Sequence, residues 1–135
     1  MLNFKISIEE EDGEYVVFCD KLELYGQHES VDMALKSFQD GIDLLASEFD
    51  PEHRRAVFDL KNGYFHFADT AAMLPFILSQ FRRSSKKSFK DLTESLGMAS
   101  QGAVTKYFNP KNKTIPNVDK FFRLLESMDC KIKID

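Results

Sequence analysis

Apolar side chains stand at every second position of residues 2–8, the pattern of a half-buried strand. Asp12-Gly13 then marks a tight hairpin turn, and the β-branched and aromatic run at residues 15–19 predicts an antiparallel second strand. A third short strand is expected at residues 23–27. The chain therefore opens with three strands joined by turns.

The clearest helix follows Ser30, which is placed to cap it. Apolar residues recur at spacings of three and four and form one stripe that must cover a sheet; they are Val31, Ala34, Leu35, Phe38, Ile42, Leu45 and Phe49. The polar face of this helix carries Asp32, Asp40 and Asp43. Asp50-Pro51 ends the helix, because proline disfavours a helical residue before it.

Two more strands are predicted at residues 54–61 and 64–68, on either side of an Asn62-Gly63 hairpin turn. Their expected core residues are Phe58, Leu60, Phe65 and Phe67. The front of the chain thus has the order β-β-β-α-β, with an extra strand allowed, and this part ends near residue 68.

Helical periodicity dominates the rest of the chain. A helix with the buried stripe Leu74, Ile77, Leu78 and Phe81 is expected to have Pro75 in its first turn and two arginines at its carboxyl end. A last helix, residues 118–128, follows the polar loop 109–116, and residues 130–135 alternate as a closing strand.

Residues 88–109 predict two short helices joined by a tight turn. Gly97 supplies the left-handed residue that ends the first, and Ser100 is expected to cap the second. Short polar and cationic side chains there suit a helix that reads the DNA major groove. The predicted DNA-binding residues are Ser100, Gln101, Gly102, Thr105 and Lys106, with Lys111 and Lys113 in the following loop. An ordinary pair of core helices is the alternative.

The net charge of -4 hides an uneven distribution. Residues 1–70 contain 6 Lys+Arg against 16 Asp+Glu, a balance of −10, whereas residues 71–135 contain 12 against 6, a balance of +6. Two modules with different partners are therefore expected, and the basic one suits a phosphate-bearing partner. No apolar run is long enough for a membrane helix and no signal-peptide pattern opens the chain, so we expect a cytoplasmic protein.

No catalytic constellation is recognisable. Three histidines, His28, His53 and His66, stand far apart and lack a ligand pair, and Cys19 and Cys130 lack metal-ligand spacing. Both cysteines are expected to be buried or half-buried thiols. We therefore expect neither an enzyme nor a bound metal or cofactor.

In this order, the two halves resemble the HicB family of antitoxins of type II toxin–antitoxin systems. In the first half the resemblance is carried by FKISIEEEDGEYVVFCD and YGQHESVDMALKSFQDGIDLL, and in the second by FKDLTESLG, VTKYFN and CKIKID. Three features depart from the family. DKLELYG lacks the Pro-Gly often found before the helix, Thr93 replaces a small Ala, and Gly97 precedes Val104 by seven steps instead of six.

The resemblance implies an α+β protein with two domains. Residues 1–68 would form a β-β-β-α-β partial RNase H-like module that binds the toxin, and residues 69–135 an all-α Cro-like helix–turn–helix domain. Such a protein neutralises a basic, HicA-like toxin that cleaves mRNA, and represses its own operon by binding double-stranded operator DNA as a dimer or dimer of dimers. Charge complementarity then selects the toxin-binding acids: Asp12, Glu14, Asp20, Asp32, Asp40 and Asp43.

Two other functions compete with this one. The chain could be a stand-alone repressor whose front module dimerises or senses a ligand. It could also be a vestigial RNase H-like enzyme, which needs converging carboxylates that hold divalent cations. The acids of residues 9–14 and Asp20 instead crowd a turn and a strand end, which disfavours the enzyme. The closing strand is expected either to pair two chains or to stand within one chain.

Overall fold

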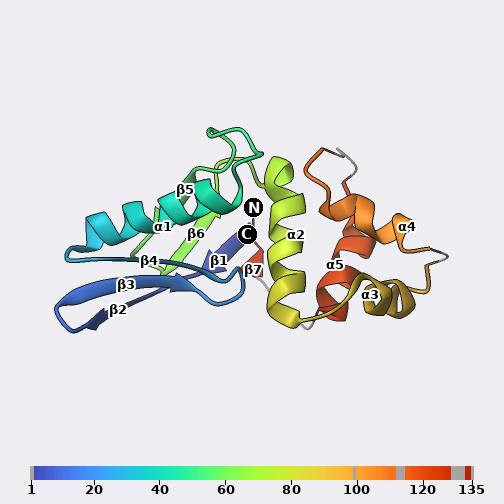
Figure 1. The fold of residues 1–135 in the computed structure, drawn as a ribbon, viewed down its shortest axis with the longest axis horizontal. Coiled ribbons are helices and arrows are strands. Elements are labelled where there is room, and N and C mark those ends of the chain that lie inside the picture. Colours follow the sequence, from blue (N-terminus) through green and yellow to red (C-terminus); the bar gives the residue numbers. More distant parts are fainter. Residues whose placement is uncertain (1, 99, 112–114, 129–132, 135) are drawn as a thin grey trace. The chain divides into compact units, whose positions relative to one another are not determined.

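The computed structural model describes residues 2–98, 100–111, 115–128 and 133–134. They form two compact units, Met1–Thr70 with Ile132–Asp135 (unit 1) and Ala71–Lys131 (unit 2). The elements appear in Figure 1 in this order: β1 Leu2–Lys5, β2 Ser7–Glu11, β3 Glu14–Cys19, β4 Leu24–His28, α1 Val31–Leu45, β5 Ala56–Asp59, β6 Tyr64–Phe67, α2 Thr70–Ser85, α3 Phe89–Leu96, α4 Gly102–Thr105, the 3-10 helix η1 Lys106–Phe108, α5 Val118–Ser127 and β7 Lys133–Ile134.

Unit 1 contains two antiparallel sheets. One has the strand order β5-β6-β1-β7 and the other β2-β3-β4. The two sheets meet at Ile6, which is buried and belongs to neither strand, and its backbone N–H donates to the carbonyl of Gly63 at 2.9 Å. The continuous first strand expected at residues 2–8 is therefore two strands in two sheets.

The end of the chain returns to its beginning. β7 pairs antiparallel with β1, with Leu2 opposite Ile134 and Asn3 opposite Lys133. β7 is therefore an edge strand of a sheet in its own chain. Whether it also joins two chains stays a prediction.

Helix α1 packs on the β2-β3-β4 sheet, chiefly against β4 (Figure 1). Ser30 caps it as expected, since its Oγ accepts the N–H of Met33 at 3.2 Å. Phe38 is fully buried and its ring lies 5.2 Å from Phe65 and 5.7 Å from Phe58. An aromatic cluster thus joins α1 to the β5–β6 hairpin.

Both predicted hairpins are present. Asp12 and Gly13 have φ values of 50° and 81°, the left-handed pair that a two-residue turn requires, and Glu11 pairs with Glu14. The second hairpin pairs Asp59 with Tyr64, so its loop has four residues, not the expected two. This longer loop places Leu60 in the turn.

Unit 2 contains helices α2 to α5. Ser88 and Asp91 form a reciprocal capping box at the start of α3. Gly97 ends α3 with φ 65°, which confirms the left-handed residue expected there. Pro75 is the sixth residue of α2 and not in its first turn as expected, because the helix already begins at Thr70.

The predicted fold class is wrong. The β-β-β-α-β partial RNase H-like module followed by an all-α Cro-like helix–turn–helix domain does not match the arrangement of the described residues, a mixed α and β structure with two small antiparallel sheets and five α-helices. The first strand is broken at Ile6, and the closing strand belongs to the sheet of unit 1 instead of following an all-α domain. Sequence periodicity could not show either feature, because both depend on pairing between distant segments.

Two residues expected in the core are exposed instead. Leu45 is 48% exposed because it ends α1, and Leu60 is 46% exposed in the hairpin loop. The alternation of the first strand also fails: Asn3 is buried, whereas Ile8 lies on the outer strand β2 and is exposed. At Leu45, Leu60 and Ile8 the end of a helix, a hairpin loop and a sheet edge, respectively, override local periodicity.

Candidate functional site

The segment predicted to read DNA is short. α4 has four residues and continues directly as η1, so the described second helix consists of one α turn and one 3-10 turn. The N-cap residue of α4 is Gln101, and its side chain makes no capping hydrogen bond. The prediction that Ser100 caps this helix is therefore wrong. Ser100 takes part through its backbone, because its carbonyl accepts the N–H of Ala103 at 3.2 Å.

Five of the predicted DNA-binding residues lie at the two ends of this short helix. Ser100, Gln101 and Gly102 are exposed at its start, whereas Thr105 and Lys106 are half-buried at its end. A further two were expected in the next loop: Lys111 is exposed, and Lys113 lies outside the described residues. Polar groups therefore reach the surface at the amino-terminal end of α4, where a major-groove reader presents them.

The core of unit 2 holds this segment in place. The Phe108 ring lies 5.1 Å from Phe89 of α3, and its carbonyl accepts the hydroxyl of Ser79 of α2 at 3.4 Å. Lys106 Nζ lies 5.1 Å from the centre of the Tyr107 ring, whose hydroxyl accepts from Lys120 of α5 at 3.5 Å. α2, α3 and α5 thus all contact the segment that carries Lys106.

A basic hollow of about 600 Å³ opens where α2 ends and α3 begins. It is lined by four cationic and three neutral polar residues: Arg82, Arg83, Lys86, Lys87, Ser79, Gln80 and Ser88. We call this feature the basic hollow. The RRSSKK run in the sequence contains its cations, but sequence reasoning assigned them to the dipole of α2 and missed the site.

The side chain of Arg82 is held in place by its neighbours in the basic hollow. Its guanidinium carbon lies 4.1 Å from the centre of the Phe89 ring, and its Nη1 donates to the carbonyl of Lys87 at 3.2 Å. Its Nε is buried and has no hydrogen-bond partner among the described residues. The guanidinium is thus oriented before any ligand arrives.

The acidic residues predicted to bind a toxin do not gather at one place. Asp12 and Asp20 lie in turns at opposite ends of β3, and Asp32 and Asp40 are exposed on α1. Glu14 lies in β3, where its carboxylate accepts from the Gln27 side chain at 2.6 Å. Asp43, the sixth, is engaged in a separate contact network.

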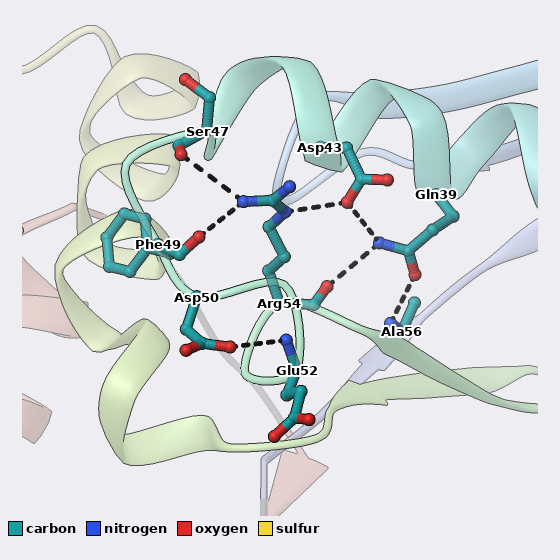
Figure 2. A network of polar contacts seen from close by, with 8 residues as sticks. All are labelled: Gln39, Asp43, Ser47, Phe49, Asp50, Glu52, Arg54 and Ala56. Atoms are coloured by element: carbon teal, nitrogen blue, oxygen red, sulfur yellow. Dashed lines mark hydrogen bonds and ion pairs between the residues drawn. The ribbon is translucent and has the colours of Figure 1, made fainter.

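Asp43 joins α1 to the loop that leads to β5 (Figure 2). Its carboxylate accepts from Arg54 Nε at 2.9 Å and from the Gln39 amide at 3.1 Å. Arg54 also donates to the carbonyl of Phe49 at 2.5 Å, and Gln39 accepts the N–H of Ala56 at 2.6 Å. Asp43 therefore has a structural role that the polar helix face did not reveal.

Strand register gives the β2-β3-β4 sheet two different faces. Val17 lies opposite Gly26, and a Cβ on Gly26 would point into α1, so this row faces the helix. The adjacent residues Val16 and Phe18 therefore point to the other face. Glu14 also lies on this open face. The face further carries the residues that pair across the strands with Glu14, Val16 and Phe18, which are Ser7, Glu9, Glu11, Tyr25 and Gln27.

The open face combines negative charge with apolar area. Tyr25 of β4 is 68% exposed, and Glu9 and Glu11 are exposed on β2, on the other side of the central strand β3. Asp32 and Asp40 lie on the far side of α1 from this sheet, because α1 turns Ala34, Phe38 and Ile42 inward. Unit 1 thus offers two separate acidic surfaces, the open sheet face and the outer face of α1.

Among the residues that the structure describes, two side chains have a shifted pKa. Burial is the main cause that raises the pKa of the Cys19 thiol from 9.0 to about 11, and this thiol is buried as expected. The second cysteine, Cys130, lies outside the described residues. Hydrogen bonds from the backbone and hydroxyl of Ser88 lower the pKa of Asp91, consistent with the capping box. Neither shift lies among the residues predicted to bind a partner.

The described residues contain no group of three or more His, Cys, Asp or Glu side chains arranged to hold a metal ion. Within the same residues, no helix is both long and apolar enough to span a membrane. Comparison with models of known protein families and with curated proteins finds no match to this chain.

Proposed function

We propose that this protein is a cytoplasmic antitoxin and repressor similar to the HicB family. Unit 1 would bind and neutralise a basic, HicA-like toxin that cleaves mRNA. Unit 2 would bind operator DNA of the protein's own operon, with the protein acting as a dimer. The chain has no catalytic role in this proposal.

The division of charge between the two units is the observation that supports this function. Residues 1–70 carry 6 Lys+Arg against 16 Asp+Glu, and residues 71–131 carry 11 against 5, so the balances are −10 and +6. The change of sign falls at the boundary between the compact units. Opposite charges on separate units suit two partners of opposite charge, a basic protein and a nucleic acid.

The DNA arm is tested with a duplex taken from upstream of the protein's own coding sequence. We expect affinity to fall steeply with salt, because each neutralised phosphate releases counterions. Gln101→Ala should reduce discrimination between this duplex and a scrambled one by about 1–3 kcal/mol if Gln101 contacts a base. Lys111→Ala should weaken both duplexes equally. Binding that is insensitive to salt and to both changes would refute the DNA arm.

The toxin arm is tested with two matched charge reversals. Asp32→Lys with Asp40→Lys alters the outer face of α1, and Glu9→Lys with Glu11→Lys alters the open sheet face by the same charge. Asp43 is left intact, because its reversal would break the contact with Arg54. Each pair controls for the general charge effect of the other.

A toxin bound through one acidic surface should associate more slowly with only one of the two variants, and most clearly at low salt. The assays are rescue of growth when protein and toxin are expressed together, and association rates with the purified toxin. The toxin used is the basic protein encoded beside this chain's gene. Undiminished rescue by both variants would refute electrostatic toxin capture, and absence of such a neighbouring gene would favour a stand-alone repressor.

A further inference from the structure

The basic hollow lies in a strip of chain that contains five cations and no acid. Residues 82–90 include Arg82, Arg83, Lys86, Lys87 and Lys90. The next residue, Asp91, is an acid, and its carboxylate accepts the backbone N–H of Ser88 at 3.1 Å within the capping box. The surface where α2 passes into α3 is therefore strongly positive.

Arg82 gives this positive surface a fixed group. The Phe89 ring and the Lys87 carbonyl restrain its guanidinium, so less side-chain freedom remains to be lost when an anion binds. A planar guanidinium matches the geometry of phosphate oxygens. An oriented arginine beside Lys86 and Lys87 is a suitable arrangement for a phosphate.

Packing contacts also link the basic hollow to the segment proposed to read DNA. Phe89, which stacks on Arg82, contacts the Phe108 ring at 5.1 Å, and Ser79 of the basic hollow donates to the Phe108 carbonyl at 3.4 Å. Phe108 belongs to η1, the same turn as Lys106. Both surfaces are therefore parts of unit 2 that share packing contacts.

We propose that the basic hollow receives a backbone phosphate of the DNA duplex that unit 2 binds. This inference rests on the proposed DNA binding and extends the contact from α4 to the α2–α3 connection. A strip of cations running from α2 into α3 suits a repeating phosphate backbone better than a single compact anion. Contacts of this kind position a protein on the duplex without reading sequence.

The test removes two exposed cations of the basic hollow with Arg83→Gln and Lys86→Gln together. Arg82 is left in place, because it also supports Phe89 and the α2–α3 connection. The control is Lys21→Gln with Lys61→Gln, which removes the same charge from exposed positions of unit 1. Binding of the full chain is measured by fluorescence anisotropy, with the upstream duplex and a scrambled duplex at several salt concentrations.

The double variant in the basic hollow should bind both duplexes more weakly. The slope of log affinity against log salt should become shallower by about 1 to 2, since each lost phosphate contact accounts for about 0.9. The control variant should keep the wild-type slope. A parallel NMR titration of the free protein with inorganic phosphate distinguishes a small anion from DNA.

Three results would overturn the inference. If wild type binds DNA with a salt-dependent affinity and the double variant keeps the same slope, the basic hollow is not a phosphate contact and the proposed function stands. If inorganic phosphate binds the basic hollow while the DNA slope is unchanged, the site serves a small anion. If wild type binds neither duplex, the proposed DNA binding fails and this inference fails with it.

Discussion

Adding a single methyl group at Gly26 should strongly destabilise unit 1. It lies in β4 in regular register opposite Val17, and α1 passes directly over it. A Cβ built on Gly26 would lie 2.2 Å from the backbone nitrogen of Phe38, 2.4 Å from the carbonyl oxygen of Ala34 and 2.7 Å from the Cα of Phe38. All three are backbone atoms, so no rotamer change can relieve the overlap.

The structure also sets the size of the expected effect. Atoms in ordinary contact lie about 3.5–4 Å apart, so Gly26→Ala requires α1 and β4 to separate by roughly 1 Å, and a gap of that size already forfeits a quarter to a half of each lost contact. Ala34, Phe38 and Ile42 all lose contacts in this way, since they form the buried side of α1. We expect Gly26→Ala to lower the free energy of unfolding by an amount at or above the upper end of the ~1–3 kcal/mol range for overpacking.

Gly41→Ala is the matched control, on helix α1, which packs over Gly26. The nearest atom to its added Cβ is the carbonyl oxygen of Tyr25 at 3.5 Å, an ordinary contact. Alanine is favoured over glycine in a helix interior by up to ~1 kcal/mol, so this variant should be as stable as wild type or more so.

Both variants are compared by urea denaturation of the full chain. The chain has no tryptophan, and three of its four tyrosines, Tyr15, Tyr25 and Tyr64, lie in unit 1, so tyrosine fluorescence reports mainly on that unit. The inferred close approach of α1 to β4 is contradicted if Gly26→Ala lowers the free energy of unfolding by less than ~1 kcal/mol. It is also contradicted if the two variants have the same free energy of unfolding.

Two further predictions concern the contact network and the buried thiol. Asp43→Ala should lower the free energy of unfolding by about 1–2 kcal/mol, because Arg54 and Gln39 lose their hydrogen-bond acceptor. The control Asp40→Ala should change the free energy of unfolding by no more than ~0.5 kcal/mol. Equal losses for the two variants in urea denaturation would contradict a structural role for Asp43. Because the pKa of Cys19 is raised from 9.0 to about 11, the folded state keeps a thiol proton that the unfolded state loses above pH 9. The contribution of this thiol to the free energy of unfolding should therefore be fully present below pH 9. It should fall by about 2–3 kcal/mol as the pH rises to about 11. Cys19→Ala should flatten this decline, and parallel pH profiles for wild type and variant would contradict it.

Local sequence alone was sufficient where a structural feature depends on neighbouring residues. The Asp12-Gly13 turn, the Ser30 cap, the stripe of α1 and the left-handed Gly97 were all predictable, because turn geometry and helix capping involve residues within one turn of each other. The change of charge near residue 70 was also readable, since it is a property of composition. These features are local, and the folded chain keeps them.

Tertiary structure decided the features that join distant parts of the chain. In the sequence, Gly26 is only a glycine within a predicted strand, because its close contact with α1 depends on how a helix eight or more residues later packs. Asp43 looked like part of a solvated face until Arg54, eleven residues away, supplied its partner. The break at Ile6, the return of β7 to β1 and the basic hollow likewise require pairing, packing or a shared surface, which hydrophobic periodicity cannot encode because it records only the environment along one element.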